Sequence, residues 1–289
     1  MTTASQWLQG ARPRTLAISV APVLVGTAAA SIERPVIWWR AFAALVVALA
    51  LQVGVNYAND YSDGIRGTDR ERRGPLRLTA SGVATPQAVR LAAAVSFAIA
   101  AVVGLVVSVV VSPWLLLVGA VAVAAAVLYT GGPKPYGYEG LGELSVLVFF
   151  GFVATAGSAF VQLHRVPAVA WWASVALGLP ACAILLANNV RDVETDRVGG
   201  KRTLAVRVGA GPARRLFVAC LVGAFLAVGG AAIERPWALL ALLAIPFALR
   251  PARLVLTRSD APGLVGALLD TTRLELVLGV LLAAGFFLS

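Results

Sequence analysis

Two polar stretches stand at the ends of long apolar runs: residues 56–63 read Asn-Tyr-Ala-Asn-Asp-Tyr-Ser-Asp, and residues 188–196 read Asn-Asn-Val-Arg-Asp-Val-Glu-Thr-Asp. They begin 132 residues apart, and each places an Asn four residues before an Asp. Carboxylates are costly to keep beside hydrocarbon, so ionisable groups in such a setting indicate a functional site by default. The pair therefore predicts apolar helices that end at a shared polar site.

The composition excludes a soluble globular protein. Of 289 residues, 59% are hydrophobic and 13% are charged, whereas soluble domains carry about 25% charged residues. A net charge of +10 could indicate nucleic acid as a partner. Here the basic residues lie between apolar segments, which is typical of a membrane protein. We therefore expect a lipid bilayer, and no nucleic acid, as the partner of this surface.

The apolar runs set the expected topology. A bilayer core of about 30 Å needs about 20 apolar residues per helix. Nine runs approach this length, and they cover residues 15–31, 36–58, 88–111, 113–131, 141–163, 169–190, 214–232, 236–254 and 270–288. We predict an all-α integral membrane protein that forms a single transmembrane domain, residues 1–289, with nine helices.

The basic residues predict the orientation. With a cytoplasmic N-terminus, 20 of the 24 Lys and Arg residues fall on the cytoplasmic side, as positive-inside placement requires. Six tryptophans fall at the outer ends of even-numbered runs, where an interfacial belt is expected: Trp38, Trp39, Trp114, Trp171, Trp172 and Trp237. We predict a cytoplasmic N-terminus and a C-terminus outside the cell.

The two polar stretches then face the cytoplasm at the ends of the second and sixth runs. Four runs separate them, and a basic, glycine-containing loop follows each one. This spacing predicts two four-helix pseudo-repeats plus a ninth helix. The Asp-bearing segments, about 56–82 and 188–209, would present equivalent loops to one cavity.

The spacing within each stretch predicts metal binding. Positions four apart share one face of a helix, so Asn56 and Asp60 form one column, and Asn59 and Asp63 form its neighbour. The second stretch forms a single column: Asn188, Asp192 and Asp196. A divalent cation would remove the repulsion between these carboxylates, and oxygen ligands favour Mg²⁺ bridging to substrate phosphates. Solvated helix caps would explain one such stretch, but not two at equivalent positions.

Cations are interleaved with these carboxylates: Arg66, Arg70, Arg72, Arg73, Arg77, Arg191, Arg197, Lys201, Arg202 and Arg207. Positive-inside placement explains basic residues here, but not their alternation with Asp. Carboxylates for metal, together with Arg and Lys for phosphate oxygens, predict a diphosphate site. Among the cations, Arg72, Arg77 and Lys201 are our candidates for binding the diphosphate.

A third cytoplasmic loop, residues 129–138, reads Tyr-Thr-Gly-Gly-Pro-Lys-Pro-Tyr-Gly-Tyr. Its Gly and Pro residues predict turns. Its tyrosines and Lys134 fit either an interfacial turn or a substrate-binding role, and the residues alone leave both open. Tyr129 and Lys134 are the substrate-binding candidates.

Taken together, these motifs resemble a known family. The stretch 56–63 with Asp69, the run 73–82 and the stretch 188–209 resemble the UbiA superfamily of intramembrane aromatic prenyltransferases. Within it they look most like the 1,4-dihydroxy-2-naphthoate polyprenyltransferases of menaquinone synthesis. The resemblance spans nearly the whole chain. It implies nine helices that surround a central cavity, in a protein of a bacterial-type cell membrane. It also implies two Mg²⁺ ions that join a polyprenyl diphosphate to both Asp motifs.

The motifs and the resemblance together predict roles for individual residues. The metal ligands would be Asn56, Asp60, Asp63, Asn188, Asp192 and Asp196, the four aspartates being catalytic. The substrate contacts, to the diphosphate or the aromatic acceptor, would be Arg72, Arg77, Lys201, Lys134 and Tyr129. In one departure, Gly64 stands where many members carry an acidic residue, so that Asp63 or Asp69 completes the first motif. In another, Asn188 replaces a common Asp with a neutral ligand.

The implied reaction is Mg²⁺-dependent transfer of a polyprenyl group to 1,4-dihydroxy-2-naphthoate, with loss of CO₂ and diphosphate, giving demethylmenaquinone. Related enzymes acting on 4-hydroxybenzoate, homogentisate or haem are the alternative. A cation-coupled transporter would instead place polar groups near the bilayer midplane with access from both sides. In this sequence the candidate groups gather at the cytoplasmic ends.

Overall fold

The computed structural model describes residues 2–67 and 76–289, and within them every regular element is helical. The α-helices are α1 (Ala4–Ala11), α2 (Ala17–Ser31), α3 (Trp38–Arg66), α4 (Pro86–Val111), α5 (Trp114–Thr130), α6 (Gly142–Val146), α7 (Gly157–Leu163), α8 (Ala168–Arg191), α9 (Val193–Val198), α10 (Leu204–Val208), α11 (Ala210–Glu234), α12 (Ile245–Thr257) and α13 (Ala261–Phe287). Shorter 3₁₀ and π segments connect them: η1 (Pro13–Thr15), η2 (Tyr136–Glu139), η3 (Leu147–Ala156) and η4 (Pro236–Ala244). The predicted all-α class is confirmed.

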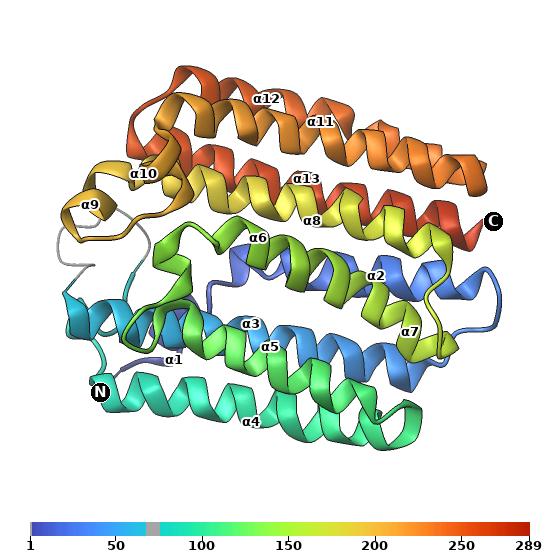
Figure 1. Cartoon of the computed structure of the whole chain (residues 1–289), viewed down its shortest axis with the longest axis horizontal. Coiled ribbons are helices and arrows are strands. Elements are labelled where there is room, and N and C mark those ends of the chain that lie inside the picture. The colour runs from blue at the N-terminus through green and yellow to red at the C-terminus, as the bar shows by residue number, and fades with distance from the viewer. Residues whose placement is uncertain (1, 68–75) are drawn as a thin grey trace.

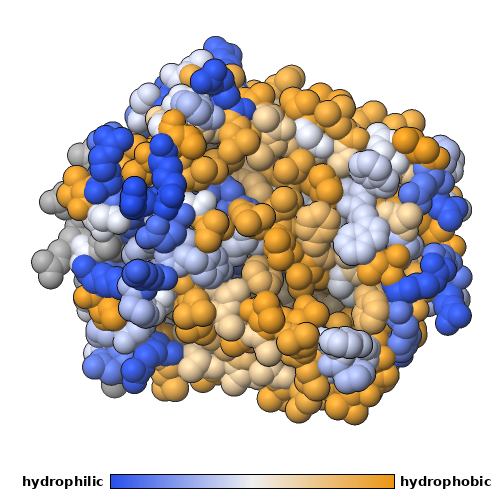
Figure 2. Space-filling view, viewed as in Figure 1, coloured by the Kyte–Doolittle hydropathy of each residue, from blue (hydrophilic) through white to orange (hydrophobic). Residues whose placement is uncertain are grey.

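The long helices run side by side along the bundle, and the two chain termini lie at its opposite ends (Figure 1). α13 packs against α2, α8 and α12, while α3 packs against α4. The visible face is mostly hydrophobic along its length, and hydrophilic residues gather at the two ends (Figure 2). Helices satisfy their backbone hydrogen bonds internally, as a segment in the bilayer core must. The apolar surface between two polar ends is therefore consistent with a bundle that spans a bilayer.

Six helical stretches in the described part of the chain are long and apolar enough to cross a membrane: α3, α4, Gly142–Leu163, α8, α11 and Pro236–Thr257. A seventh arises if the bent pair Ala4–Thr15 and α2 counts as one span. Helices overlap all nine predicted runs, but the predicted count of nine is not confirmed. The reasons are that α5 is shorter and that α13 carries Asp270, Arg273 and Glu275 near its middle.

Close packing around α8 fixes the second polar stretch. A Cβ added at Gly178 of α8 would lie 2.9 Å from Cα of Gly151 in η3, so the two backbones meet directly. Small residues permit such approach between membrane helices. On its other sides α8 packs against α11 and α13, within a core that contains Leu177, Leu186 and Phe217. The polar end of α8 therefore belongs to a helix that is closely packed against η3, α11 and α13.

The first polar stretch is carried past the apolar part of α3. A helix of 29 residues is about 43 Å long at 1.5 Å per residue, which exceeds a hydrocarbon core of about 30 Å. Its last turns, with Asn59 and Asp63, lie beyond that length. Gly67 then ends the helix with φ 73°, a left-handed conformation that favours glycine.

Candidate active site

A pocket of about 140 Å³ lies at the end of the bundle that holds α9 and α10. Acidic and amide side chains from both polar stretches line it: Asn59, Asp63, Asn188, Asn189, Asp192 and Asp196. Three cations reach it from different segments: Arg12, Arg77 and Lys201. Tyr129, Tyr138 and Leu185 add aromatic and apolar surface. The predicted meeting of the two stretches at one pocket is thus what the structure shows.

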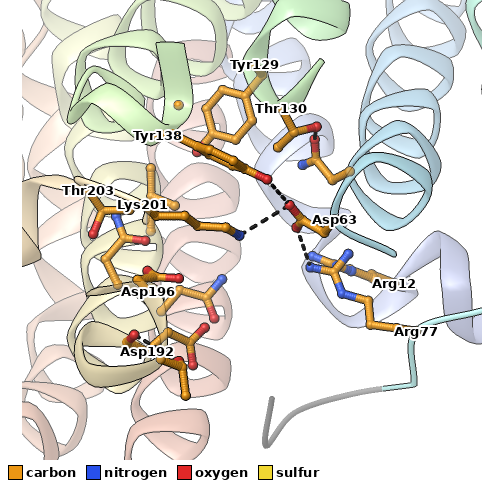
Figure 3. Close-up of a pocket in the computed structure, with 16 residues that line it drawn as sticks. Arg12, Asp63, Arg77, Tyr129, Thr130, Tyr138, Asp192, Asp196, Lys201 and Thr203 are labelled. Atoms are coloured by element: carbon orange, nitrogen blue, oxygen red, sulfur yellow. Dashed lines mark hydrogen bonds and ion pairs between the residues drawn. The ribbon is translucent and has the colours of Figure 1, made fainter. Parts of the chain in front are cut away.

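Asp63 is the centre of this pocket (Figure 3). Its residue is 3% exposed, and Lys201 Nζ lies 3.2 Å from Oδ1 while the Arg77 guanidinium lies 3.6 Å from Oδ2. The Tyr138 hydroxyl donates a further hydrogen bond to Oδ1. Charge-assisted contacts of this kind are stronger than neutral ones. One carboxylate therefore orients two cations and a phenol from three separate segments.

The loop after α9 delivers Lys201 to that position. Lys201 donates its backbone N–H to the Asp196 carbonyl at 2.8 Å, and Arg202 donates to the Tyr138 carbonyl at 2.7 Å. Gly200 allows the turn, with φ +75°. The Lys201 ammonium lies 4.7 Å from the centroid of the Tyr138 ring, within the range of a cation–π contact. The loop is thereby tied both to the second polar stretch and to η2.

The opposite wall is formed where α8 gives way to α9. Asp192 ends α8 and accepts two hydrogen bonds from the Arg191 guanidinium, at 2.7 and 2.6 Å. Asn189 donates its side-chain amide to Glu143 of α6 at 2.8 Å. Glu143 is buried, and its hydrogen bond to Asn189 beside the pocket was not predicted from the sequence. A single carboxylate within the apolar run 141–163 was the signal that could have identified it.

Asn56 and Asp60 do not reach the pocket. Asn56 donates its Nδ2 to the Ala11 carbonyl at 2.9 Å, while the Asp60 carboxylate accepts the backbone N–H groups of Leu78 and Thr79, each at 2.8 Å. The neighbouring column lines the pocket instead, where Asn59 accepts a hydrogen bond from Thr130 at 2.7 Å. Other segments cover this face of α3, and the predicted ligand role of Asn56 and Asp60 stays a prediction.

The tyrosine-rich loop is divided between the pocket and its support. Tyr129 lines the pocket and meets Tyr136 edge to face, with centroids 5.5 Å apart. Burial raises the pKa of Tyr136, whose hydroxyl donates to the Ala125 carbonyl at 2.9 Å. Lys134 is exposed and is not among the residues that line the pocket, and its predicted contact with substrate stays a prediction. The candidates Arg72 and Asp69 lie outside the described residues.

The donor set fits a hard cation that shares its shell with a substrate. Among residues 2–67 and 76–289, no three His, Cys, Asp or Glu side chains are grouped closely enough to hold an ion alone. Carboxylates face the pocket from two walls, Asp63 on one and Asp192 and Asp196 on the other, with neutral amide oxygens beside them. Mg²⁺ commonly takes one or two carboxylates and completes its shell with waters and phosphate oxygens. The pocket has the oxygen ligands for that arrangement.

Comparison with known proteins assigns the fold to a family. The family model described as "UbiA prenyltransferase family" matches residues 19–268. A 1,4-dihydroxy-2-naphthoate octaprenyltransferase of Mycobacterium tuberculosis is 48% identical over 271 residues, covering 94% of this chain and 93% of that protein. The protein of the same description from Mycobacterium leprae is 45% identical over 289 residues, covering 100% and 98%.

A solved structure has the same fold. The structure of a UbiA homologue from Archaeoglobus fulgidus, described as bound to GPP and Mg²⁺, aligns with a TM-score of 0.68 at 14% identity. The alignment covers 96% of this chain and 99% of that one. The predicted family resemblance is confirmed: with several membrane-length apolar helices and matches over nearly its whole length, this chain is an integral membrane protein of the UbiA prenyltransferase family.

Proposed function

We propose that this chain transfers a polyprenyl group from a polyprenyl diphosphate to 1,4-dihydroxy-2-naphthoate, releasing CO₂ and diphosphate and giving the dihydroxy (quinol) form of demethylmenaquinone, which a separate two-electron oxidation converts to the quinone. The observation that carries the proposal is the pocket in which carboxylates from both polar stretches lie with Arg12, Arg77 and Lys201. The relatives named for this acceptor, at 45 and 48% identity over nearly the full chain, support the choice of ring.

The residues that would hold Mg²⁺ are oxygen-bearing side chains from the two polar stretches that line the pocket: Asn59, Asp63, Asn188, Asp192 and Asp196. When bound there, Mg²⁺, which we propose as two ions, supplies positive charge against the negative charge of the departing diphosphate. The donor chemistry supports this choice, since all five side chains offer oxygen.

The cations of the pocket bind the diphosphate oxygens. Asp63 keeps Lys201 and Arg77 within 3.2 and 3.6 Å of its own oxygens, so both are in place before substrate arrives. As the bond between the allylic carbon and the diphosphate oxygen breaks, its electron pair stays on that oxygen. Preorganised cations stabilise this developing charge without reorganising, which is usually the largest catalytic contribution.

The ring then attacks the allylic carbon. Its electron-rich carbon that bears the carboxylate forms the new C–C bond, and the electrons of the bond to CO₂ return to the ring as CO₂ leaves. Tyr129 and Leu185 give the pocket the aromatic and apolar surface against which a flat ring can pack.

We propose further that a single domain, residues 1–289, crosses the membrane nine times, as two four-helix units and a last helix. Helices in the described residues overlap all nine runs, and the termini lie at opposite ends of the bundle (Figure 1), as an odd number of crossings requires. The distribution of Lys and Arg supports a cytoplasmic pocket and N-terminus and an outer C-terminus.

The test is transfer of a labelled polyprenyl group by membranes that contain the protein. Dihydroxynaphthoate and 4-hydroxybenzoate are supplied in parallel with Mg²⁺, and membranes without the protein are the control. We expect a labelled lipid-soluble product and release of CO₂ with dihydroxynaphthoate alone. Product from 4-hydroxybenzoate instead would overturn the choice of acceptor, and product from neither ring would overturn the proposed reaction.

A further inference from the structure

The face of α3 that carries Asn56 and Asp60 contacts two segments that supply cations to the pocket. Asp60 is 1% exposed, and its Oδ2 and Oδ1 accept the backbone N–H groups of Leu78 and Thr79, each at 2.8 Å. Leu78 directly follows Arg77 in the chain, and Arg77 lies beside Asp63. A buried carboxylate therefore holds the backbone next to a pocket cation.

The packing around these bonds makes the segment depend on Asp60. Leu78 is fully buried and belongs to a small cluster with Ala11 and Tyr57. Gly10 lets α1 close over this cluster, since an added Cβ would lie 2.7 Å from the Leu78 side chain. A buried carboxylate is costly unless its oxygens are satisfied, and here backbone N–H donors serve both oxygens. Side chain and segment thus stabilise each other's position.

Asn56 makes a similar contact to the residue that precedes a second pocket cation, Arg12. It donates to the carbonyl of Ala11 at 2.9 Å, and the next residue, Arg12, ends α1 with φ 56°. A left-handed conformation is uncommon for a residue other than glycine, and it persists only where the surroundings determine it. On this face of α3, Tyr57 also donates to the Trp7 carbonyl at 2.8 Å.

We propose that Asp60 is a positioning residue for diphosphate binding, which places Arg77 at the pocket by fixing the backbone of Leu78 and Thr79. It contacts neither metal nor substrate in this assignment. Both carboxylate oxygens already accept backbone N–H groups, and Asp60 is not among the residues that line the pocket. The inference rests on the proposed function, because it assumes that the pocket binds a diphosphate.

The first test needs no activity. Amide hydrogen exchange is measured on the purified protein, with Asp60→Asn compared to Asp63→Asn as the matched control. Asn keeps the size of the side chain and one acceptor oxygen, so we expect a folded protein, recognised by unchanged exchange in α8 and α13. We expect the amides of residues 78–79 to exchange about tenfold faster or more in Asp60→Asn, and at the wild-type rate in Asp63→Asn. Unchanged exchange in Asp60→Asn would overturn the inference.

The second test asks whether Asp60 acts through Arg77. We expect Asp60→Asn to raise the KM for the polyprenyl diphosphate about tenfold, with the KM for the ring unchanged. In an Arg77→Met background the same substitution should add less than about twofold, because coupled residues are not additive. Effects that multiply in the double variant, with a raised Mg²⁺ requirement for Asp60→Asn, would show a metal ligand instead and overturn the assignment.

The two tests separate the inference from the function on which it rests. If the wild-type protein transfers no prenyl group, the proposed function fails while the exchange result still decides whether Asp60 holds the segment. If the wild-type protein is active and the exchange at residues 78–79 ignores Asp60→Asn, the positioning role alone fails.

Discussion

Replacing Lys201 tests whether a positive charge in the pocket is needed for catalysis. Its ammonium lies 3.2 Å from Asp63 Oδ1, and both side chains are largely buried, at 13% and 4% exposure. At that distance two unit charges interact by about 5 kcal/mol with an effective dielectric constant of about 20. Replacing Lys201 by Met keeps most of the apolar stem and removes the charge.

The net effect is smaller than the Coulomb value, because Arg77 remains 3.6 Å from the same carboxylate. Removing one preorganised donor to a developing negative charge costs the transition state about 2.7 to 4 kcal/mol. We take the lower end, about 3 kcal/mol, as the loss of stabilisation of the departing diphosphate. Since about 1.4 kcal/mol is tenfold, Lys201→Met should lower kcat/KM by about two orders of magnitude.

The assay is the initial rate of labelled product in membranes that contain equal amounts of each variant. Lys134→Met is the matched control, because Lys134 is exposed and lies outside the pocket. We expect this control to keep near wild-type kcat/KM. A Lys201→Met protein within about threefold of wild type, or an equal loss in Lys134→Met, would refute the reasoning.

Three further outcomes follow from the same contacts. Removing divalent ions with a chelator should abolish transfer and added Mg²⁺ should restore it, as the oxygen donors require; full activity in the chelator would contradict the metal assignment. Tyr138→Phe keeps the ring beside Lys201 but removes the hydroxyl that donates a hydrogen bond to Asp63. A hydrogen bond to a charged group contributes enough that kcat/KM, measured as above, should fall about tenfold. An unchanged kcat/KM would show that this hydrogen bond does not contribute to catalysis. Gly26→Ala should lower the midpoint of thermal unfolding, because its Cβ would lie 2.1 Å from the Thr155 carbonyl oxygen. The Cβ of Gly119→Ala would meet nothing within 4 Å, so this control should leave the midpoint unchanged. Equal midpoints for the two variants would contradict the close packing at Gly26.

The sequence was sufficient to predict that the two polar stretches share a site. Asp63, Asp192 and Asp196 were predicted to meet, and all three line one pocket. The prediction was possible because each stretch follows an apolar helix, and the ends of these two membrane-length helices lie at the same membrane surface. Arg77 and Lys201 could be predicted for the same reason, since each lies in the loop that follows its stretch.

The sequence could not decide which column of α3 faces the pocket. Asn56 with Asp60, and Asn59 with Asp63, have the same residue types at the same spacing. Which of them is covered depends on how α1 and the segment at Leu78 pack on α3, through contacts 45 and 18 residues apart in the chain. Such packing leaves no periodic signal in either column.

The positions of other residues depend on tertiary packing in the same way. Lys134 lies in a loop of Gly and Pro turns, whose side-chain directions depend on the turn geometry rather than on spacing. Arg12 was used only for orientation, although it lines the pocket, because its place depends on the break after α1. The predicted count of nine crossing helices is not confirmed, since α5 is short and α13 carries charges in its middle.

The central claim is that carboxylates from both polar stretches form one diphosphate site. The most direct measurement compares Mg²⁺-dependent transfer of a labelled polyprenyl group to dihydroxynaphthoate by wild type, Asp63→Asn and Asp192→Asn, each purified and returned to liposomes. We expect both variants to insert normally and to lose about two orders of magnitude or more in kcat/KM, the usual cost of removing one preorganised charged or polar group from an active site. Near wild-type transfer by either variant would contradict the account.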